Sequence, residues 1–424
     1  MNFIQEMEWR GMVHDCTPGF SEELNKGVTS AYVGFDPTAD SLHIGNLVPI
    51  MLLVHYQKSG HKPIALVGGA TGMIGDPSGK KSERKLLTHE QIEYNLSLIK
   101  PQLELFLNFD LGDISAEIVN NMDWFRDMNM ISFLRDIGKN LTLNYMMAKD
   151  SVQTRLDSGI SFTEFSYQLV QAYDFYYLSK YKNCKAQIGG SDQWGNITAG
   201  IELIKKMSNN KGYALTCPLI TKHDGSKFGK TEDGNIWLDP KRTSPYKFYQ
   251  YWLNISDEDA EKWIKIFTTL SHADISECIN KHKNEPHLRI LQKTLAEKIT
   301  SRVHGHSSYQ NALEVSRILF GKNTSSELVT ISEQDFLMVF EGVEQYSCSK
   351  ELLSNGVSPV DLLTEYSGAF KSKGEVRRLI TSNAMSINKV KIRLDDVIND
   401  KSLLNNKFLL VQKGKKNYLI LRFD

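Results

Sequence analysis

The stretch that decides the fold is Tyr32–Asn46, which reads YVGFDPTADSLHIGN. Its first residues suit a strand, which Gly34 and Pro37 bring to an end. Ser41 is expected to cap the next helical turn, because a serine oxygen accepts hydrogen bonds from the amides at a helix N-terminus. The apolar run Leu47–Val54 then predicts a buried helix. A strand, a turn of small residues and a helix N-terminus together favour a phosphate site, because the first amides of a helix carry partial positive charge.

Two residues inside this stretch add to the phosphate site. His43 offers a donor to a charged oxygen, and Gly45 lets a nucleotide approach the backbone closely because it has no Cβ. A His-x-Gly pattern alone arises by chance in many chains and is more often a surface or satisfied histidine. The preceding residues, GFDPTADS at Gly34–Ser41, make the pattern specific. The whole stretch resembles the signature of the class I aminoacyl-tRNA synthetases, and in particular of the tyrosyl-tRNA synthetases.

Length and charge describe a chain of several domains. At 424 residues it is long for one domain, so two or three are expected. Its 41% hydrophobic and 24% charged residues are ordinary for a globular protein. Lys+Arg and Asp+Glu total 50 each, but Lys371 to Asp424 holds 13 Lys+Arg against 5 Asp+Glu. A basic tail on a more acidic body predicts that the C-terminal part binds a polyanion.

The five cysteines are scattered and include no Cys-x-x-Cys pair. This pattern indicates free thiols in a reducing compartment and argues against a disulfide framework or a structural zinc site. The first residues include Glu6, Glu8 and Asp15 and no long apolar run, which argues against a signal peptide. No segment is apolar over the length that a bilayer requires. We therefore expect a cytoplasmic protein with no membrane partner.

A second stretch, KPIALVGGATGMIGDP, covers Lys62–Pro77. Its apolar run Ile64–Val67 predicts a buried parallel strand, and the glycines after it predict a loop over a ligand. These glycines are spaced wrongly for the dinucleotide fingerprint. Three residues instead of four separate Gly75 from Gly79, which does not fit a P-loop. The sequence therefore supports neither a nicotinamide enzyme nor a P-loop ATPase.

A run of cations follows this loop, with the sequence SGKKSERK at residues 78–85. Such a run is ordinarily a solvated surface segment. The family resemblance favours a functional interpretation, since Lys80 and Arg84 match loop residues near the leaving pyrophosphate. Residues 86–158 are interpreted as alternating helices and loops, with apolar residues at helical spacing that pack inside: Leu86, Ile92, Leu96 and Ile99.

A helix is predicted over Ser161–Asp174, SFTEFSYQLVQAYD. Tyr167, Gln171 and Asp174 stand at i, i+4 and i+7, so they project from one face. From this segment alone, a solvent-facing polar stripe would explain that face equally well. Its apolar neighbours indicate that the helix lies against the body of the protein, where buried polar groups need partners. We therefore expect this face to bind a polar ligand.

Two later segments carry groups suited to a nucleotide. Ala186–Ile197, AQIGGSDQWGNI, predicts a strand that ends in a Gly-Gly turn with Asp192 and Gln193, where an acidic residue can bind ribose hydroxyls. The segment DGSKFGKTE at 224–232, here called the lysine loop, places Lys227 and Lys230 three residues apart. It occupies the place of the second class I signature, whose lysines neutralise charge that grows on a triphosphate.

The rest of the chain divides into a helical part and a basic part. Thr243–Gly321 has the pattern of packed helices and resembles the anticodon-side domain of the family. From Gly356 onward, a basic helix and several strand-like segments resemble the S4-type RNA-binding module. Basic residues that face phosphates give affinity without much sequence reading. The residues expected to bind RNA are Lys371, Lys373, Arg377 and Arg378.

The resemblance covers nearly the whole chain and implies a fold and an activity. The expected fold is α/β: a Rossmann-like parallel-sheet catalytic domain over 1–220, the lysine loop and a helical domain over 221–320, a connector over 321–355 and a small α+β S4-like domain over 356–424. The implied activity is a tyrosine–tRNA ligase, which makes tyrosyl-adenylate from ATP and tyrosine and then transfers tyrosine to the 3′ end of tRNA(Tyr). Mg²⁺ is expected to accompany ATP, with no protein-bound metal or organic cofactor. The family implies a homodimer.

The resemblance also assigns the residues of the site. Those expected at the phosphates are Thr38, His43, Lys80, Arg84, Lys227 and Lys230. Those expected to bind the rest of ATP are Gly34, Asp36, Gly45, Asn46 and Asp192. Those expected to bind tyrosine are Tyr32 and Asp174 at the phenol hydroxyl, Asp76, Tyr167 and Gln171 at the ammonium, and Gln193. Because the substrate carboxylate is itself the nucleophile in the first step, no serine, cysteine or general base is required.

Three positions depart from the usual motifs of the family. Asn46 stands where the best-known form has His, Val33 stands where many relatives have Cys, and Phe228-Gly229 replaces Met-Ser. None of these changes removes a charged group.

Three other functions are weighed against the tyrosine enzyme. The sister tryptophanyl synthetases are the nearest alternative, but Tyr32 and the Tyr167 face favour tyrosine. A nucleotidyltransferase of another kind has no use for the basic RNA module. A pure RNA-binding protein has no use for Asp76, Asp192 and the lysine loop together.

Overall fold

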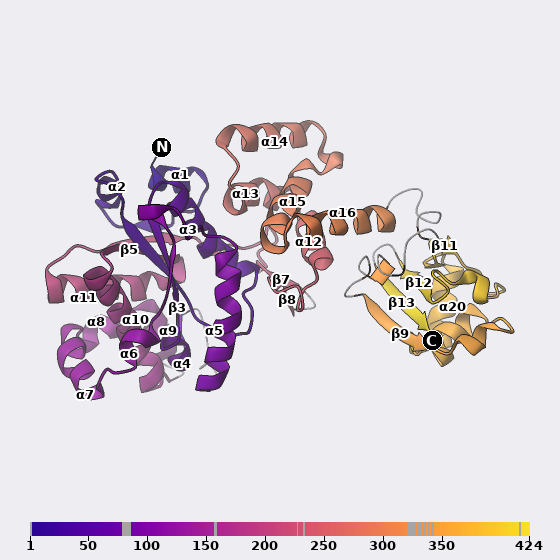
Figure 1. Ribbon diagram of the computed structural model, residues 1–424, viewed down its shortest axis with the longest axis horizontal. Helices are drawn as coiled ribbons and strands as arrows, with labels where there is room; N and C mark the ends of the chain where they lie inside the picture. The colour runs from indigo at the N-terminus through magenta and orange to yellow at the C-terminus, as the bar shows by residue number, and fades with distance from the viewer. Residues whose placement is uncertain are drawn as a thin grey trace. The chain divides into compact units, whose positions relative to one another are not determined.

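The computed structural model describes residues 2–78, 86–156, 159–226, 228–231, 234–320, 343–414 and 417–424, together with residues 328, 333, 336, 337 and 340. Two compact units make up the chain (Figure 1). Unit 1 comprises Met1–Arg242 and Tyr251–Val303, and unit 2 comprises Thr243–Gln250 and His304–Asp424. The domain boundaries predicted at residues 220, 320 and 355 are not those of the two units, and they stay predictions.

A six-stranded sheet forms the centre of unit 1, in the order β1-β6-β5-β2-β3-β4. All neighbouring pairs are parallel except β1 with β6. β3 is buried along nearly all its length, as a parallel strand covered on both faces should be, and it confirms the strand predicted at Ile64–Val67. The strands are β1 Asp15–Cys16, β2 Ser30–Phe35, β3 Lys62–Val67, β4 Glu117–Asn120, β5 Cys184–Gly190 and β6 Tyr213–Cys217.

Helices pack on this sheet (Figure 1). The helix α3, Leu47–Lys58, joins β2 to β3 and is almost entirely buried, because it packs on the sheet, on α1 and on α13. α10 and α11 pack on each other and on β5, and in Figure 1 they lie to the side away from α3 and α5. The other helices of this part are α1 Phe3–Trp9, α2 Phe20–Leu24, α4 Thr71–Ile74, α5 His89–Glu104, α6 Met122–Phe125, α7 Met130–Ser132, α8 Leu143–Met147, α9 Asp150–Leu156, α10 Phe162–Tyr181, α11 Trp194–Ser208, α13 Asp257–Phe267, α14 His272–Asn284 and α15 Ile290–His304.

The order of the strands locates the candidate site. From β2 the chain proceeds to β3 and then β4 on one side, and it later returns to β5 and β6 on the other side of β2. In open α/β sheets, ligands bind at such a switch point, beyond the carboxyl ends of the strands. The loops that follow β2, β3, β4 and β5 therefore frame the candidate site.

Unit 2 is built around a five-stranded sheet in the order β11-β10-β12-β13-β9. The basic helix and the strands predicted after it are confirmed. Val376 on α20 and Leu409 and Leu421 on the central strands belong to one apolar core. The strands are β9 Glu344–Cys348, β10 Met385–Ile387, β11 Val390–Lys391, β12 Phe408–Lys413 and β13 Asn417–Phe423, and the helices are α16 His306–Phe320, α19 Pro359–Asp361 and α20 Lys373–Thr381. Two further elements complete the chain. The hairpin of β7 Lys230–Thr231 with β8 Gly234–Asn235 belongs to unit 1, and α12 Pro245–Leu253 has residues in both units.

Some sequence predictions differ from the structure in detail. Leu86 is 54% exposed and precedes α5, whereas Ile92, Leu96 and Ile99 are buried as predicted. Residues 86–158, interpreted as helices and loops, also contain the strand β4. Glu344–Cys348, placed in the predicted connector, is a strand that pairs in parallel with β13 and contributes Cys348 to the core of unit 2.

Within the described ranges, no helix has both the length and the apolar character that crossing a membrane would require.

Candidate active site

Polar side chains follow the carboxyl ends of four neighbouring strands. Asp36 follows β2, Thr71 follows β3, Asn121 follows β4 and Gln193 follows β5. A glycine permits two of them to meet, since a Cβ on Gly68 would lie 2.2 Å from Asp36 Oδ1 and 2.3 Å from Thr71 Oγ1. The switch point of the sheet is therefore lined by hydrogen-bonding groups from separate parts of the chain.

Asp174 on α10 is the most deeply buried carboxyl of this site, with 1% of its surface exposed. Its oxygens accept hydrogen bonds from Trp124 Nε1 at 2.9 Å and from Asn121 Nδ2 at 3.1 Å. Burial raises the pKa of Asp174 to about 8, although both hydrogen bonds act in the opposite direction. The carboxyl is therefore held in place by two donors while its charged form is disfavoured.

Tyr32 on β2 lies close to this carboxyl. Burial raises the pKa of Tyr32, and the negative charge of Asp174 adds to the rise. The Tyr32 hydroxyl is buried and has no hydrogen-bond partner among the described residues. An unpaired buried hydroxyl beside a carboxyl suits a ligand that brings a hydroxyl of its own.

A hydrogen-bonded chain leads from Asp174 to a second carboxyl. Asn121 Nδ2 also contacts Thr71 Oγ1 at 3.1 Å, and that hydroxyl donates to Asp36 Oδ1 at 2.7 Å. The other oxygen of Asp36 accepts from the Tyr167 hydroxyl at 2.7 Å. One oxygen of Asp36 therefore contacts Tyr167, which the sequence assigned to tyrosine, although the sequence assigned Asp36 itself to ATP.

A third carboxyl, Asp76, completes this surface. Its Oδ2 accepts from Gln193 Nε2 at 2.7 Å, and its Oδ1 accepts from Ser78 N at 2.9 Å. Gln171 on α10 joins the group, because its Nε2 donates to Gln193 Oε1 at 3.4 Å, and Asn196 Nδ2 donates to Gln171 Oε1 at 3.2 Å. The structure therefore brings together Asp76, Gln171 and Gln193, which come from three separate segments.

Tyr167 lies among these acidic groups. Burial raises its pKa, and the charges of Asp36, Asp76 and Asp174 raise it further. Asp36 and Asp76 have the largest of these charge effects, and two carboxylates near one buried hydroxyl produce a negative potential that attracts a cation. This end of the site is thus suited to an ammonium group.

The first signature motif has a different local structure from the one predicted. His43, and not Ser41, is the N-cap of the short 3-10 turn Ile44–Asn46. Its Nδ1 accepts a hydrogen bond from Gly45 N at 3.0 Å, so the ring proton is on Nε2. Ser41 Oγ instead accepts from Asp239 N at 3.1 Å. His43 therefore presents Nε2–H as a donor, as a phosphate site needs.

Gly45 is required by this arrangement. A Cβ at this position would lie 2.7 Å from His43 Cε1 and 2.9 Å from His43 Nδ1. The sequence attributed Gly45 to close approach of a nucleotide, and the structure adds that it makes room for the histidine ring. Asn46 Oδ1 accepts from His43 N at 3.0 Å, which fixes the other side of the turn.

Backbone hydrogen bonds join the segment that follows the lysine loop to this motif. Ile44 N donates to Ile236 O at 3.0 Å, and Leu238 N donates to Leu42 O at 2.8 Å. Gly229 lies directly on the motif, since a Cβ added to it would be 3.0 Å from Ile44 Cγ1. The two signatures, at Tyr32–Asn46 and at 224–232 in the sequence, therefore meet in unit 1.

Some predicted residues add nothing to this geometry. Lys80, Arg84 and Lys227 lie outside the described residues, as does the side chain of Lys230. Gly34, Thr38 and Asp192 are exposed, at the end of β2, in the following loop and in the turn after β5.

Sequence reasoning missed several residues that hold the site together. Asn121 and Trp124 position Asp174, Thr71 links it to Asp36, and Asn196 contacts Gln171. The signal for Asn121 is its place directly after an apolar strand, which requires recognising β4. No local pattern marks Trp124, because its partner is 50 residues away.

The basic residues that the sequence assigned to RNA binding differ in their surroundings on and beside α20. Arg377 and Arg378 are exposed and line a surface hollow on α20. Lys373, in contrast, forms ion pairs with Asp361 at 2.7 Å and Glu365 at 2.6 Å, and these neutralise it locally. Lys371 is exposed and precedes the helix.

Comparison with known proteins decides the family. Residues 24–321 match the family of class I tRNA synthetases for W and Y, and residues 335–421 match the C-terminal domain family of SYY-like tyrosine–tRNA ligases. The tyrosine–tRNA ligase of Porphyromonas gingivalis is 55% identical over 427 aligned residues, which cover 99% of both chains. The chain is a member of the tyrosyl-tRNA synthetases. The tyrosine–tRNA ligase of Cytophaga hutchinsonii, 55% identical over the full length of both chains, agrees with this assignment.

Solved structures of tyrosyl-tRNA synthetases share the fold. The C-terminally truncated mitochondrial enzyme of Aspergillus nidulans is 28% identical, with a TM-score of 0.69, and covers 75% of this chain and 94% of its own. A tryptophanyl-tRNA synthetase of Encephalitozoon cuniculi reaches a TM-score of 0.53 at 14% identity. Because the tryptophanyl enzymes have the same fold, sequence identity and not the fold separates the two families. The predicted fold class and family are thereby confirmed.

Proposed function

We propose that this chain activates tyrosine with ATP to form tyrosyl-adenylate and then transfers tyrosine to the 3′ end of tRNA(Tyr). One observation carries the choice of substrate: the unpaired Tyr32 hydroxyl lies beside the buried carboxyl of Asp174, at one end of a site whose other end is acidic. Tyrosine has a hydroxyl at one end and an ammonium at the other. Its two polar ends match the two polar ends of the site.

Tyr32 and Asp174 are proposed to bind the phenol hydroxyl. Asp174 accepts a hydrogen bond from the phenol hydroxyl, and the Tyr32 hydroxyl donates a hydrogen bond to the phenol oxygen. If the ligand had no hydroxyl, the Tyr32 hydroxyl would have no partner among the described residues, and Asp174 would keep only its bonds from Trp124 and Asn121. Trp124 and Asn121 keep the carboxyl oriented toward the ring.

Asp76, Tyr167 and Gln171 are proposed to bind the ammonium, with Gln193 beside them. Asp36 strengthens this end of the site. Its carboxyl accepts a hydrogen bond from the Tyr167 hydroxyl, so the lone pairs of the Tyr167 oxygen can accept a hydrogen bond from the ammonium. We therefore place Asp36 on the tyrosine side of the site and not, as the sequence suggested, on the ATP side.

The remaining residues are proposed to bind ATP. Nε2–H of His43 and the Thr38 hydroxyl donate to phosphate oxygens, helped by Lys80, Arg84, Lys227 and Lys230. Gly34, Gly45, Asn46 and Asp192 hold the nucleoside. Mg²⁺ arrives with ATP as part of that substrate. Among the described residues, no group of three or more His, Cys, Asp and Glu side chains is arranged to hold a metal ion.

Positioning and charge stabilisation supply the catalysis. The tyrosine carboxylate attacks the α-phosphorus of ATP, the bond to the β-phosphate oxygen breaks, and pyrophosphate leaves. The ribose hydroxyl at the tRNA end then attacks the tyrosyl carbonyl and AMP leaves. Cations and the His43 donor stabilise the charge that grows on the phosphates in the first step.

The C-terminal unit is proposed to bind tRNA through Lys371, Arg377 and Arg378. Lys373 contributes less, since two acidic neighbours already pair with it. Phosphate contacts of this kind act mainly through charge and depend on salt.

A homodimer is proposed as the active assembly, with a second copy of this chain covering the apolar residues exposed between 130 and 162. The most exposed large apolar side chains of this range would be removed from water at such an interface. They are Met130 at 67%, Ile131 at 69%, Leu143 at 65% and Phe162 at 72% exposure. We also propose that the chain works in the cytoplasm, a compartment that suits its five free cysteines.

Isotope exchange between pyrophosphate and ATP, measured with purified chain and single amino acids, tests the activation step. Exchange that requires tyrosine, and that tryptophan does not support, is the expected result. Exchange that depends on tryptophan, or no exchange with any amino acid, would overturn the proposed substrate. Charging of tRNA(Tyr) by the same preparation tests the second step.

A further inference from the structure

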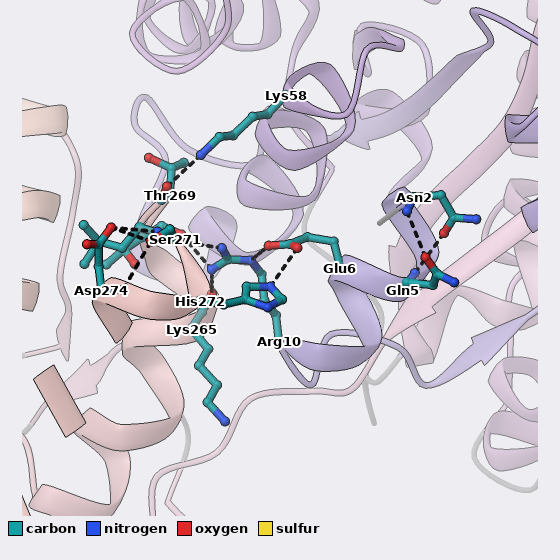
Figure 2. A network of polar contacts seen from close by, with 12 residues as sticks. Asn2, Gln5, Glu6, Arg10, Lys58, Lys265, Thr269, Ser271, His272 and Asp274 are labelled. Carbon is teal, nitrogen blue, oxygen red and sulfur yellow. Dashed lines mark hydrogen bonds and ion pairs between the residues drawn. The ribbon is translucent and has the colours of Figure 1, made fainter. Parts of the chain in front are cut away.

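A cluster of polar contacts at the N-terminus joins two parts of unit 1 that are more than 250 residues apart (Figure 2). Arg10 follows α1, and its side chain is 2% exposed. Its guanidinium donates to Lys265 O, to Thr268 O at 3.1 Å and to Leu270 O at 2.9 Å. Three backbone carbonyls at the C-terminal end of α13 are thus held by one side chain, which satisfies groups that a helix end leaves without partners.

Neighbouring side chains orient the guanidinium of Arg10 and attach the segment that it contacts. Glu6 Oε1 accepts from Arg10 Nε at 2.7 Å, and Glu6 Oε2 lies 2.9 Å from His272 Nε2 (Figure 2). The His272 ring stacks on Trp9, with centroids 3.6 Å apart and planes 12° from parallel. Lys58 donates to Thr269 O at 2.7 Å from α3. The segment after α13 is therefore attached to α1 and to α3 at several points.

The carbonyls that Arg10 holds lie on both sides of Phe267, the last residue of α13. Phe267 is 3% exposed and stacks on Phe228, with centroids 5.1 Å apart and planes 15° from parallel. Trp263 meets the same ring edge to face at 4.8 Å, and Trp252 lies at 6.1 Å. We call Phe267, Trp263 and Trp252 the aromatic socket of Phe228.

Phe228 is the first of the two residues that stand between the lysines of the lysine loop. The next residue, Gly229, lies against Ile44 and Gly45 of the first motif. The aromatic socket therefore fixes the point at which the lysine loop meets the histidine motif. If the aromatic socket moved, Phe228 and the loop that carries the lysines would move with it. A small displacement of catalytic groups is enough to slow a reaction.

We propose that Arg10 is a positioning residue for adenylate formation: by holding the backbone on both sides of Phe267, it sets the aromatic socket that seats Phe228 and so aligns the lysine loop with the histidine motif. The inference rests on the proposed function, because it concerns the rate of the same reaction. Arg10 touches no substrate. It acts through Phe267 and Phe228, so substitutions of Arg10 and Phe228 should affect one and the same step.

A double-mutant cycle tests the inference. Arg10→Met removes the three carbonyl bonds, and Phe228→Leu removes the stacked ring. We expect each to slow single-turnover adenylate formation by about tenfold, and the double variant to lose about tenfold as well and not a hundredfold. Tyrosine affinity, measured at equilibrium, should change less than twofold, because the tyrosine site touches neither residue. If Arg10→Met does not fold, Arg10→Lys replaces it, since lysine keeps the charge beside Glu6 but lacks the planar fork.

Gln57→Met is the matched control for loss of stability. Gln57 Nε2 donates to Asn108 O at 2.6 Å and to Ile114 O at 3.0 Å, so it also ties distant backbone to a buried side chain, but this backbone lies between α5 and β4 and not after α13. It should lower the melting temperature and leave the rate of adenylate formation unchanged. The inference would be overturned if the rate losses of Arg10→Met and Phe228→Leu multiplied in the double variant. It would also be overturned if Arg10→Met lowered the melting temperature and left the rate of adenylate formation unchanged. Absence of tyrosine-dependent exchange in the unmodified protein would instead overturn the proposed function.

Discussion

Replacing Asp174 by asparagine should change how the stability of the protein depends on pH. Burial raises the pKa of Asp174 to about 8, from an ordinary value of 3.8. Between these two values the native state holds a proton that the unfolded chain has released. The free energy of unfolding contributed by this group therefore falls as pH rises through that window.

The magnitude follows from one proton. Binding of one extra proton by the native state gives a slope of about 1.4 kcal/mol per pH unit, so the contribution of Asp174 falls by about 2 kcal/mol between pH 5.5 and pH 7.0. Asparagine cannot titrate and lacks this slope. Relative to the unmodified protein, Asp174→Asn should therefore gain about 2 kcal/mol of stability over the same pH interval.

Denaturant-induced unfolding of the full chain at several pH values, followed by tryptophan fluorescence, measures this difference. Asp136→Asn is the control, because Asp136 is exposed, pairs with Arg135 and has a pKa below its ordinary value. That group titrates below the window, so the control should keep the slope of the unmodified protein. Parallel pH profiles for Asp174→Asn and the unmodified protein would refute the argument that burial raises the pKa of Asp174 in the protein without substrate.

Three further results are expected. Lys230→Ala should slow adenylate formation and leave tyrosine binding nearly unchanged, because the charge that Lys230 neutralises develops in the transition state. Single-turnover kinetics measure the rate, and equilibrium binding measures the tyrosine affinity. A collapse of tyrosine affinity at an unchanged rate would contradict the assignment. Exchanging Arg377 and Arg378 for glutamate should weaken tRNA charging at physiological salt and spare pyrophosphate exchange, so equal losses in both assays would argue against a role in RNA binding. Gly45→Ala should reduce exchange activity, because its Cβ would lie 2.7 Å from His43 Cε1 and displace the ring; full activity in that variant would show that the ring position is not needed.

The sequence predicts most of the fold because its decisive signals are local. The apolar run of β3, the buried helix after Asn46 and the polar face of α10 each follow from neighbouring residues with a regular period. β9 escapes prediction, because its strand conformation depends on pairing with β13, more than 70 residues later, and only Cys348 of its residues is buried.

The candidate site is predictable to a lesser extent. Tyr32, Tyr167 and Asp174 come together as expected, since motif and helix period place them. The supporting contacts of Asn121 and Trp124 depend on loop geometry at the end of β4, which no local pattern encodes. The prediction that Ser41 caps the first motif is wrong for a related reason. Ser41 Oγ accepts a hydrogen bond from Asp239 N of a distant segment, and His43 is the N-cap of the helical turn.

Discrimination between tyrosine and phenylalanine tests the central claim most directly, because the two substrates differ by one hydroxyl. The measurement is kcat/KM in pyrophosphate exchange for both amino acids, in the unmodified protein, Tyr32→Phe and Asp174→Asn. Phenylalanine fits any site that tyrosine fits, so its rejection must come from buried partners left unpaired. The account predicts a modest loss of discrimination in Tyr32→Phe and a severe loss of tyrosine activity in Asp174→Asn. An unchanged ratio in the first variant, with tyrosine activity intact in the second, would show that the phenol hydroxyl is bound elsewhere.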